Sequence, residues 1–421
     1  MPNDRAHQLR VGAVGCGVVA TAYYFPYLLD EPRARLVAVC DLDASRAEAS
    51  KRLFDAEAAY TDYHDMLDRA NLDAVLILTS PGTHAAFALA AAERGIHLLL
   101  QKPMAISLAD ATRIVDAVRS AGVKAVIEPS AFTALEDDLA HLRRLVDRGV
   151  LGDPYWFSYI DPGPDSYHGL MGGNPYGNAA FFAKDSGGML FDFPYAPSHI
   201  VTILGDCRSV SGLGKISVPE RFIVPETYYT EFLEQATDPH DANYWDVVFD
   251  RPKSQRVPME AEDNVFSLYE MDSGATGVFH VGRPFHPALP GTTASSGLQI
   301  YGTEGNLVFG GGYTASVITS KKHLLPRVDE DGWYHIPIRG DHRKAQWPKP
   351  VPGAFNYYAE STRYLIDCVL GGGDPLVNVE WGRHITEMLH GAIESSRTGR
   401  RYEMTTTTRG LRGADASGAV A

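Results

Sequence analysis

The first 130 residues alternate between two hydrophobic periodicities, and this alternation constrains the fold more than any other feature of the chain. Five short, continuous apolar runs are typical of strands buried on both faces of a parallel sheet. These runs are Leu9–Val14, Arg35–Cys40, Ala74–Leu78, Ile96–Leu100 and Val123–Ile127. Helical stretches separate them, with Thr83 and Ser107 as expected N-caps and Gly95 and Gly122 after expected helix ends. The pattern predicts βαβ units and a doubly wound parallel sheet.

The sequence changes character after Glu128-Pro129. One more amphipathic helix is expected at Leu135–Arg148, and two helices at Tyr357–Leu370 and Glu380–Thr398. Between them lie short strand candidates, and no helix separates the later ones, which indicates an antiparallel sheet. They are Tyr155–Ile160, Ser209–Ile216, Asp246–Phe249, Val265–Met271, Gly277–Val281, Leu298–Tyr301 and Asn306–Phe309. We therefore predict an α/β protein with domains at residues 1–129 and 130–404, and a flexible tail at residues 405–421.

Charge and cysteine usage argue against several classes of function. The 421 residues carry a formal net charge of −14 and contain no run of five or more Lys or Arg, so nucleic acid is not an expected partner. The four cysteines lie far apart without a CxxC pair, which is typical of a reducing compartment. Met1–Arg10 is polar, unlike a secretory signal, and the longest apolar runs are too short to span a bilayer. We expect a cytoplasmic protein without a membrane partner.

A glycine-rich turn follows the first expected strand. Residues 15–20, Gly-Cys-Gly-Val-Val-Ala, fit the pattern G-x-G-x-x-A and lead into an expected helix. Glycines at the first two positions allow a tight turn and close approach of a pyrophosphate, which rests on the helix N-terminus. The pattern predicts a dinucleotide site that uses Gly15, Gly17, Val18, Val19 and Ala20.

An acidic residue completes this pattern at the end of the second expected strand. Asp41 lies 21 residues after Ala20, where a carboxylate accepts hydrogen bonds from the adenosine ribose. Asp41 would repel a 2′-phosphate, and residue 42 is not basic, so we predict NAD in preference to NADP. Arg46 is the one nearby cation that could compensate.

Gln101-Lys102-Pro103 comes directly after the fourth expected strand. A lysine at the carboxyl end of a parallel strand points toward the crevice where such sheets bind ligands. Position alone is equally compatible with an ordinary surface cation, so a functional role for Lys102 requires further evidence.

Six segments together resemble the Gfo/Idh/MocA oxidoreductases, from residue 9 to about residue 404. They are Val11–Tyr27, Val37–Asp43, Thr79–His84, Gln101–Pro103, Gly187–Gly205 and Ile300–Leu307. The resemblance implies an N-terminal Rossmann domain and a C-terminal α/β domain with a large open, mostly antiparallel sheet. It also implies redox chemistry on a carbohydrate or cyclitol hydroxyl with NAD(P), and a homo-oligomer in which sheets pair across subunits.

The same resemblance implies which residues line the cofactor. Gln101-Lys102-Pro103 is similar to the family's E-K-P motif, in which the lysine touches both the nicotinamide ribose and the reacting hydroxyl. Glu128 falls beside this motif at the end of the fifth expected strand. The residues implied at the cofactor are Thr79, Ser80, Pro81, His84, Gln101, Lys102 and Glu128.

Residues 187–192, Gly-Gly-Met-Leu-Phe-Asp, resemble the G-G-x-x-x-D entry to the family's catalytic helix. Many members place a histidine four residues after this aspartate, but here that position is Ala196, and His199 stands three residues further on. Asp192 and His199 are seven residues apart, so a continuous helix would put both on one side.

The departure at Ala196 leaves two candidates for the proton acceptor. Either Lys102 works with His199, or Tyr195 has taken the role. We favour His199, because its position matches the polar end of the family motif. Asp192 is expected to orient the substrate or to modulate Lys102.

The stretch Asp161–Asn178 is a long loop rich in Gly, Pro, Tyr and Asn, and loops of this kind carry function. Polar and aromatic groups suit the hydroxyls and C–H faces of a sugar. The substrate candidates in and around the loop are Tyr159, His168, Asn174, Tyr176 and Lys184. No HExxH, GxSxG or P-loop occurs, so no metal site is predicted.

Together these features predict reversible hydride transfer between a carbinol carbon and NAD. One alternative uses NAD to oxidise a glycoside transiently, so that the aglycone can be eliminated. A second alternative is a regulator that senses a sugar or dinucleotide without catalysis, against which the retention of Lys102, Asp192 and His199 argues. Few arginines lie near the catalytic segment, which disfavours a phosphorylated or strongly acidic substrate.

Overall fold

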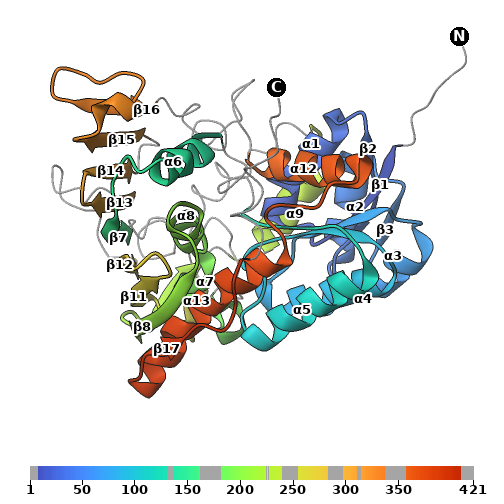
Figure 1. Ribbon diagram of the computed structural model, residues 1–421. Coiled ribbons are helices and arrows are strands. Elements are labelled where there is room, and N and C mark those ends of the chain that lie inside the picture. Colours follow the sequence, from blue (N-terminus) through green and yellow to red (C-terminus); the bar gives the residue numbers. More distant parts are fainter. Residues whose placement is uncertain are drawn as a thin grey trace, which may run out of the picture.

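The computed structural model of the chain describes residues 8–129, 137–161, 182–223, 225, 227–238, 255–282, 297–310, 314–336 and 357–408. Two large sheets lie next to each other, and helices pack against both (Figure 1). The first sheet is built from the first 130 residues, and the second from strands between residues 154 and 403. The expected fold class, a parallel sheet followed by a mostly antiparallel one, is confirmed.

The first sheet has six parallel strands in the order β3-β2-β1-β4-β5-β6. They are β1 (Leu9–Val14), β2 (Ala34–Cys40), β3 (Ala58–Tyr60), β4 (Ala74–Ile77), β5 (His97–Leu100) and β6 (Ala125–Ile127). Five of them fall at the five expected runs, whereas the short β3 was not predicted. Side chains alternate between the two faces, so that Val75 and Ile77 pack with one set of helices and Leu76 with another. Both faces are therefore covered, which explains the continuous apolar runs.

Helices fill the connections between these strands. They are η1 (Ala20–Tyr24, a π-helix), α1 (Phe25–Asp30), α2 (Ala44–Leu53), α3 (Tyr63–Arg69), α4 (His84–Glu93) and α5 (Leu108–Ala121). Asp43 and Ser107 cap α2 and α5, since their side chains accept hydrogen bonds from backbone N–H groups of the first turn. Thr83 precedes α4 without a side-chain cap, because its hydroxyl donates instead to the carbonyl of Ser80.

The second sheet has nine strands in the order β16-β15-β14-β13-β7-β12-β11-β8-β17. All neighbours are antiparallel except β7 and β12. The strands are β7 (Pro154–Asp161), β8 (Cys207–Lys215), β11 (Asn264–Met271), β12 (Thr276–Gly282), β13 (Gly297–Gly302), β14 (Gly305–Gly310), β15 (Thr314–Thr319), β16 (Trp333–Ile336) and β17 (Tyr402–Glu403). The expected strand at Asp246–Phe249 lies outside the described residues, and β15 and β16 were not predicted. A separate pair, β9 (Glu220–Ile223) and β10 (Gln255–Pro258), stands apart from this sheet.

Helices pack against one face of the second sheet. They include α6 (Asp137–Asp147), α7 (Gly188–Asp192), α8 (Tyr195–Leu204) and α13 (Val379–Thr398). The backbones of α13 and β8 approach so closely that a Cβ on Gly212 would lie 1.9 Å from the carbonyl oxygen of Ala392. The start of the expected tail also lies against α13, because the backbone N–H groups of Thr405 and Thr406 donate to Glu387.

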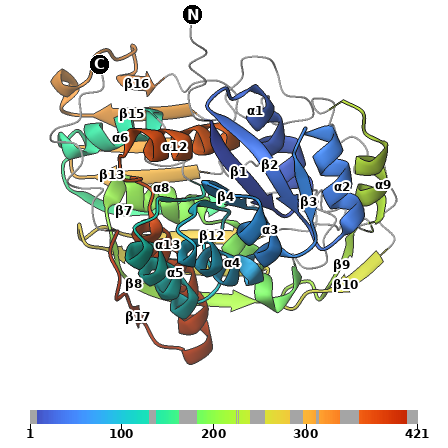
Figure 2. The same cartoon turned by 90° about the vertical axis from the view of Figure 1, so that its right-hand side faces the viewer.

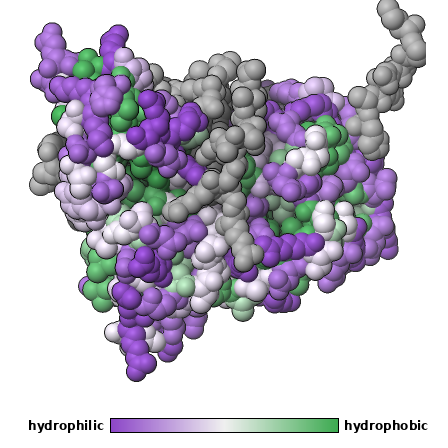
Figure 3. Space-filling model, in the orientation of Figure 1, coloured by the Kyte–Doolittle hydropathy of each residue, from purple (hydrophilic) through white to green (hydrophobic). Residues whose placement is uncertain are grey.

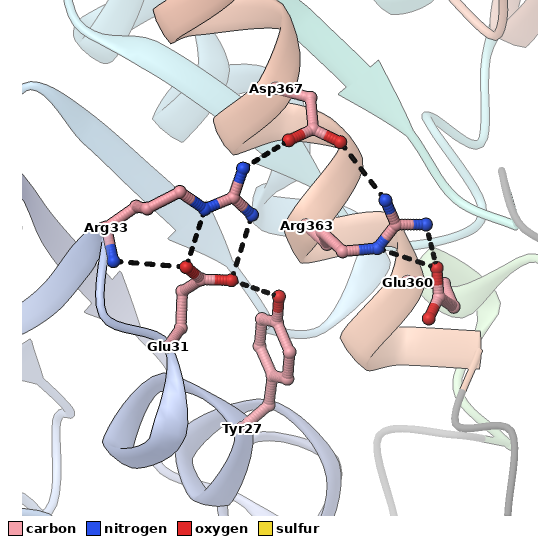
Figure 4. Close-up of polar contacts among 6 residues, drawn as sticks. All are labelled: Tyr27, Glu31, Arg33, Glu360, Arg363 and Asp367. Atoms are coloured by element: carbon pink, nitrogen blue, oxygen red, sulfur yellow. Dashed lines mark hydrogen bonds and ion pairs between the residues drawn. The ribbon is translucent and has the colours of Figure 1, made fainter. Parts of the chain in front are cut away.

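The helix α12 (Tyr357–Gly371) returns to the first sheet although it comes near the end of the chain (Figure 2). A chain of charged groups fixes it there (Figure 4). Arg33, directly before β2, pairs with Glu31 at 2.7 Å and with Asp367 of α12 at 2.6 Å. Arg363 continues the chain with a 3.2 Å contact to the other oxygen of Asp367. The hydrogen bonds from Arg33 are the main reason why the pKa of Glu31 falls to about 2.

The other face of the second sheet carries exposed apolar side chains. Leu213, Phe266 and Leu268 are 67%, 44% and 58% exposed, while the alternate residues of β11 are buried. Phe266 stacks on His280 of β12, and Trp156 stacks on Tyr301 of β13. Hydrophobic residues reach the surface at the left-hand edge of Figure 3, over β11 and β12. Within the described part of the chain, no helix is both long enough and apolar enough to cross a bilayer.

Candidate active site

The glycine-rich turn leaves β1 in a conformation that only glycine adopts readily. Gly15 has φ +92°, and a Cβ there would lie 2.7 Å from the carbonyl oxygen of Leu78. At Gly17, by contrast, a Cβ would meet no protein atom within 4 Å. The packing of the chain itself therefore does not require glycine at position 17, whereas a pyrophosphate approaching the backbone would. This difference fits a dinucleotide bound at the turn.

The residues after the turn form the start of the first helix. Val18 and Ala20 are buried, Val19 is partly buried, and the π-helix η1 begins at Ala20. π-helical segments occur often at functional sites. Here two side chains of η1 reach distant parts of the chain: Thr21 contacts Tyr229 and Tyr24 contacts Glu128.

Asp41 lies directly after β2, beside the glycine-rich turn. Its Oδ2 accepts a hydrogen bond of 2.7 Å from the backbone N–H of Cys16, and its Oδ1 accepts one of 2.9 Å from that of Asp43. These bonds hold the carboxylate in place and leave further acceptor capacity on both oxygens, since a carboxylate has about four lone-pair sites. The position therefore suits the ribose hydroxyls of a bound dinucleotide.

The stretch after β4 forms a short turn that His84 ties to the next strand end. His84 is fully buried, and its two ring nitrogens lie 2.8 Å from the carbonyl oxygen of Pro103 and 3.0 Å from that of Thr79. Burial, and to a smaller degree the nearby charge of Lys102, lowers the pKa of His84. Ser80 and Pro81 are partly exposed in the same turn. His84 thus supports the two turns from within, and Thr79, Ser80 and Pro81 form the exposed side.

Lys102, at the carboxyl end of β5, meets Asp192 from the second half of the chain. Its Nζ donates to Asp192 Oδ1 at 2.5 Å and to the backbone carbonyl of Asp192 at 3.2 Å. The same Nζ lies 5.5 Å from the centre of the Tyr195 ring, within cation–π range. Both charged side chains are largely buried, with 15% of Lys102 and 12% of Asp192 exposed. The ordinary surface position considered for Lys102 is therefore wrong.

Two consecutive glycines bring Asp192 to this position. Gly187 and Gly188 both have left-handed backbones, with φ +75° and +68°. A Cβ on Gly188 would lie 2.6 Å from the Cβ of Ala261, so a larger residue would displace the start of α7. The preceding turn, Lys184–Ser186, lies against the turn after β4, since a Cβ on Gly82 would meet Asp185. The G-G-x-x-x-D segment thus joins the two halves of the site.

The helix expected to carry both Asp192 and His199 is interrupted. Helix α7 ends at Asp192 and α8 starts at Tyr195, because Pro194 has no N–H to donate and restricts the residue before it. The seven-residue spacing therefore does not place Asp192 and His199 on one helix face. His199 is buried, and its ring stacks on Tyr159 of β7 and meets Phe309 of β14 edge-on.

Gln101 and Glu128, predicted at the cofactor, belong to a buried hydrogen-bond network behind Lys102. Gln101 donates to Tyr24 Oη at 2.9 Å and accepts from the backbone N–H of Lys102 at 2.8 Å. Tyr24 donates to Glu128 Oε1 at 2.8 Å, and Ser361 of α12 donates to Glu128 Oε2 at 2.9 Å. Both predicted residues are nearly inaccessible, with 6% and 4% exposed. The network fixes the backbone of Lys102 from inside the domain.

Among the predicted substrate residues, Tyr159 lies beside His199 and contacts Phe279. Lys184 is exposed in the turn before α7, and its backbone N–H donates to Glu260. His168, Asn174 and Tyr176 lie outside the described residues. No group of three or more potential metal ligands occurs among the described residues.

A helix that the sequence did not predict packs over the glycine-rich turn. Helix α9 (Thr227–Gln235) lies beside α2 of the first domain (Figure 2). Tyr229 is buried there; its hydroxyl donates to the carbonyl oxygen of Cys16 and lies 2.6 Å from Thr21 Oγ1. No local pattern could reveal this contact, because more than 200 residues separate Tyr229 from the turn.

Comparison with known proteins agrees with this geometry. Residues 9–128 match the family model of the GFO/IDH/MocA oxidoreductases with an NAD-binding Rossmann fold, and residues 139–308 match the GFO/IDH/MocA C-terminal domain. The chain belongs to the GFO/IDH/MocA family. Its first domain is the NAD-binding Rossmann domain of that family, as the turn at Gly15 indicates.

Two curated relatives and one solved structure illustrate the range of similar proteins. The scyllo-inositol 2-dehydrogenase (NAD(+)) of Bacillus subtilis is 26% identical over 308 residues, which are 72% of this chain and 74% of that protein. The inositol 2-dehydrogenase of Salmonella typhimurium is 29% identical over 147 residues, 35% of this chain. That match spans only 44% of the Salmonella protein, less than half of its length. A levoglucosan dehydrogenase solved with NADH and L-sorbose has the same fold, with a TM-score of 0.70 and 19% identity over 95% of this chain and 100% of that one.

Proposed function

We propose that this GFO/IDH/MocA protein is an NAD-dependent dehydrogenase that acts on a hydroxyl of a carbohydrate, glycoside or cyclitol. The observation that carries the proposal is the contact between Lys102 and Asp192, which come from different halves of the chain and meet at the carboxyl end of β5. This is the edge of a doubly wound sheet at which ligands bind. A largely buried charged pair at this edge is the arrangement expected of a reactive site.

The residues around the glycine-rich turn would hold the dinucleotide. Gly15 and Gly17 would let the pyrophosphate approach the backbone at the start of the first helix, and Asp41 would accept hydrogen bonds from the adenosine ribose. Thr79, Ser80 and Pro81 form the exposed turn on the nicotinamide side. When bound, NAD supplies the acceptor for the hydride that leaves the carbinol carbon.

The protein has to remove the hydroxyl proton as the hydride leaves. Lys102 Nζ is the group placed to take up this proton, a step that requires the amine to be neutral beforehand, and Asp192 Oδ1 at 2.5 Å stabilises the ammonium that results. Tyr195 covers the same amine with its ring, and His199 lies one turn further along the same helix, α8. We assign substrate positioning or proton relay to Tyr195 and His199, and the variants described in the Discussion distinguish between them.

The substrate class rests on two observations. The two named curated relatives are dehydrogenases of inositols, which are polyhydroxylated rings. No arginine occurs between residues 149 and 207, the stretch that includes Lys184 and the whole of α7 and α8. Because phosphate and carboxylate groups are commonly bound by arginine forks, this stretch fits a neutral polyol better than an anionic one.

The experiment is a screen of neutral sugars, cyclitols and glycosides with the purified protein and NAD, followed by absorbance of NADH. We expect substrate-dependent NADH formation that Lys102→Met and Asp192→Asn abolish and that Lys51→Met, a change on the surface of α2, leaves intact. Glycoside consumption without net NADH would instead favour transient oxidation and elimination. Dinucleotide binding without any turnover would favour a sensor. A cytoplasmic location and a homo-oligomeric state remain predictions, of which the second is taken up in the Discussion.

A further inference from the structure

Helix α9 holds a cation, Arg46, that lies close in sequence to the adenosine end of the proposed NAD site. Arg46 is the sole Lys or Arg among residues 41–50, and it lies in the first turn of α2, five residues after Asp41, the acid proposed to bind the ribose. A cation in this place is the kind of group that accommodates a 2′-phosphate in NADP-binding Rossmann domains. The contacts of Arg46 therefore influence whether the site prefers NAD or NADP.

Thr230, Asp43 and Tyr229 are among the groups that surround the guanidinium of Arg46 in the described part of the chain. Its Nε donates to Thr230 Oγ1 of α9 at 2.9 Å, and the hydroxyl of Thr230 donates in turn to Asp43 Oδ2 at 3.1 Å. Asp43 Oδ2 also lies 3.6 Å from Arg46 Nε. The guanidinium carbon lies 5.3 Å from the centre of the Tyr229 ring. Only 15% of the Arg46 side chain is exposed, so the cation is held under α9 rather than directed toward solvent.

The helix that holds Arg46 is itself attached to the domain at both ends. Near its start, Tyr229 bonds the carbonyl oxygen of Cys16 in the glycine-rich turn. At its end, Arg52 of α2 donates to the carbonyl oxygens of Glu234 and Ala236 at 3.0 Å each. A cation at the C-terminus of a helix is favourable, because the unpaired carbonyls there carry partial negative charge. Helix α9 is therefore a fixed wall of the cofactor site.

We propose that α9 determines the preference for NAD over NADP. Thr230 and Tyr229 hold the guanidinium of Arg46 under α9, so that Asp41 is the charged group that contacts the ribose. A 2′-phosphate of NADP would then lie next to this carboxylate, and Arg46 would not be available to neutralise it. The proposal rests on the proposed NAD-dependent function and names the residues that determine cofactor choice. It predicts that loosening the hold on Arg46 improves binding of NADP while binding of NAD stays nearly constant, because NAD does not use Arg46.

The test measures the dissociation constants of NAD and NADP by calorimetry, without substrate. Wild-type protein should bind NAD more tightly than NADP. Thr230→Val keeps the shape of the side chain but removes both of its hydrogen bonds, and it should tighten NADP binding about tenfold, the size of one charge-assisted hydrogen bond. Adding Arg46→Met to Thr230→Val should abolish this gain. Arg52→Met, which loosens the other end of α9 without freeing a cation near Asp41, should leave the ratio unchanged.

The binding measurements distinguish a failure of the proposed role of α9 from a failure of the proposed dehydrogenase function. An unchanged NADP affinity in Thr230→Val, or a gain that survives Arg46→Met, would overturn the role of α9 while NAD binding still supports the dehydrogenase. Wild-type protein that prefers NADP would also overturn it. A wild-type protein that binds neither dinucleotide would overturn the proposed function itself. Tyr229→Phe, which keeps the ring over Arg46, provides a second variant and should give a smaller gain than Thr230→Val.

Discussion

Tyr24 donates a hydrogen bond of 2.8 Å to Glu128 and thereby joins the π-helical start of the first helix to the end of β6. The same hydroxyl accepts from Gln101, whose side-chain oxygen in turn holds the backbone N–H of Lys102. The tyrosine thus lies between the helix that would carry the pyrophosphate and the strand end that carries Lys102, the proposed proton acceptor. Removal of the Tyr24 hydroxyl should therefore affect both the first helix and the position of Lys102.

Tyr24→Phe should destabilise the protein by about 1–3 kcal/mol, because the buried Glu128 and Gln101 each lose a partner. We also expect lower kcat with intact substrate KM, since the backbone of Lys102 is less well held. Denaturant unfolding and steady-state kinetics measure the two effects. Tyr63→Phe is the matched control: it removes another hydrogen bond from a buried tyrosine, to the carbonyl oxygen of Phe87, and should affect stability alone.

Lys102→Ala should reduce kcat by at least about 100-fold, the lower end of what a positioned acid or base contributes. The buried carboxylate of Asp192 would lose its cation, so Lys102→Ala should be compared with the double variant Lys102→Ala/Asp192→Asn, which removes both charges. Unfolding curves separate a loss of chemistry from a loss of structure. Near-normal turnover in a well-folded Lys102→Ala protein would contradict the role of Lys102.

Tyr195 and His199 can be distinguished by their pH profiles. The sequence motif favours His199, but Tyr195 is the one whose ring contacts Lys102, whereas His199 packs on Tyr159 and Phe309. We therefore expect Tyr195→Leu, which removes this ring, to lower kcat more than His199→Gln, which should mainly lower the melting temperature. Loss of a kinetic limb near the ordinary imidazole pKa of about 6.5 in His199→Gln would instead restore His199 as the proton acceptor.

The charged chain of Figure 4 makes the attachment of α12 depend on pH. Arg33 lowers the pKa of Glu31 to about 2, so this carboxylate contributes stability above the ordinary carboxyl pKa of about 4.3 and loses it as pH falls toward 2. Glu31→Gln should therefore lower the melting temperature at pH 7 and make its decline less steep between about pH 4.3 and pH 2, the interval between the two pKa values. A decline as steep as that of the wild type would show that other carboxylates dominate.

The exposed face of the nine-stranded sheet predicts self-association. Leu213, Phe266 and Leu268 form an apolar strip that a neighbouring copy of the sheet would cover. Light scattering should give a mass of at least twice the 45.9 kDa of one chain, and Phe266→Ser with Leu268→Ser should shift it toward the monomer. A wild-type protein that stays monomeric at micromolar concentration would contradict the prediction.

Local patterns were sufficient to predict where several residues of the candidate site lie. The turn at Gly15, the acid Asp41 and the lysine Lys102 each follow an apolar run, and the ends of adjacent parallel strands necessarily meet at one edge. The interruption before α8 had a visible signal in Pro194, which the spacing argument did not use. The roles of Tyr229, Thr230 and Ser361 had none, because each lies more than 180 residues from its partner and belongs to a helix without a local motif.

The packing of α12 against the first sheet has a consequence for the order in which the protein can fold during synthesis. Ser361 follows its partner Glu128 by 233 residues, and α12 also covers part of the first sheet's apolar face through Leu365 and Ile366. Domains generally fold as they leave the ribosome, N-terminal first. Here the newly made N-terminal domain would carry an uncovered apolar face, and its buried Glu128 would lack one hydrogen bond, until residues 357–371 have emerged. Synthesis of α12, rather than of the nucleotide-binding segment alone, therefore sets the earliest time at which this domain is fully packed.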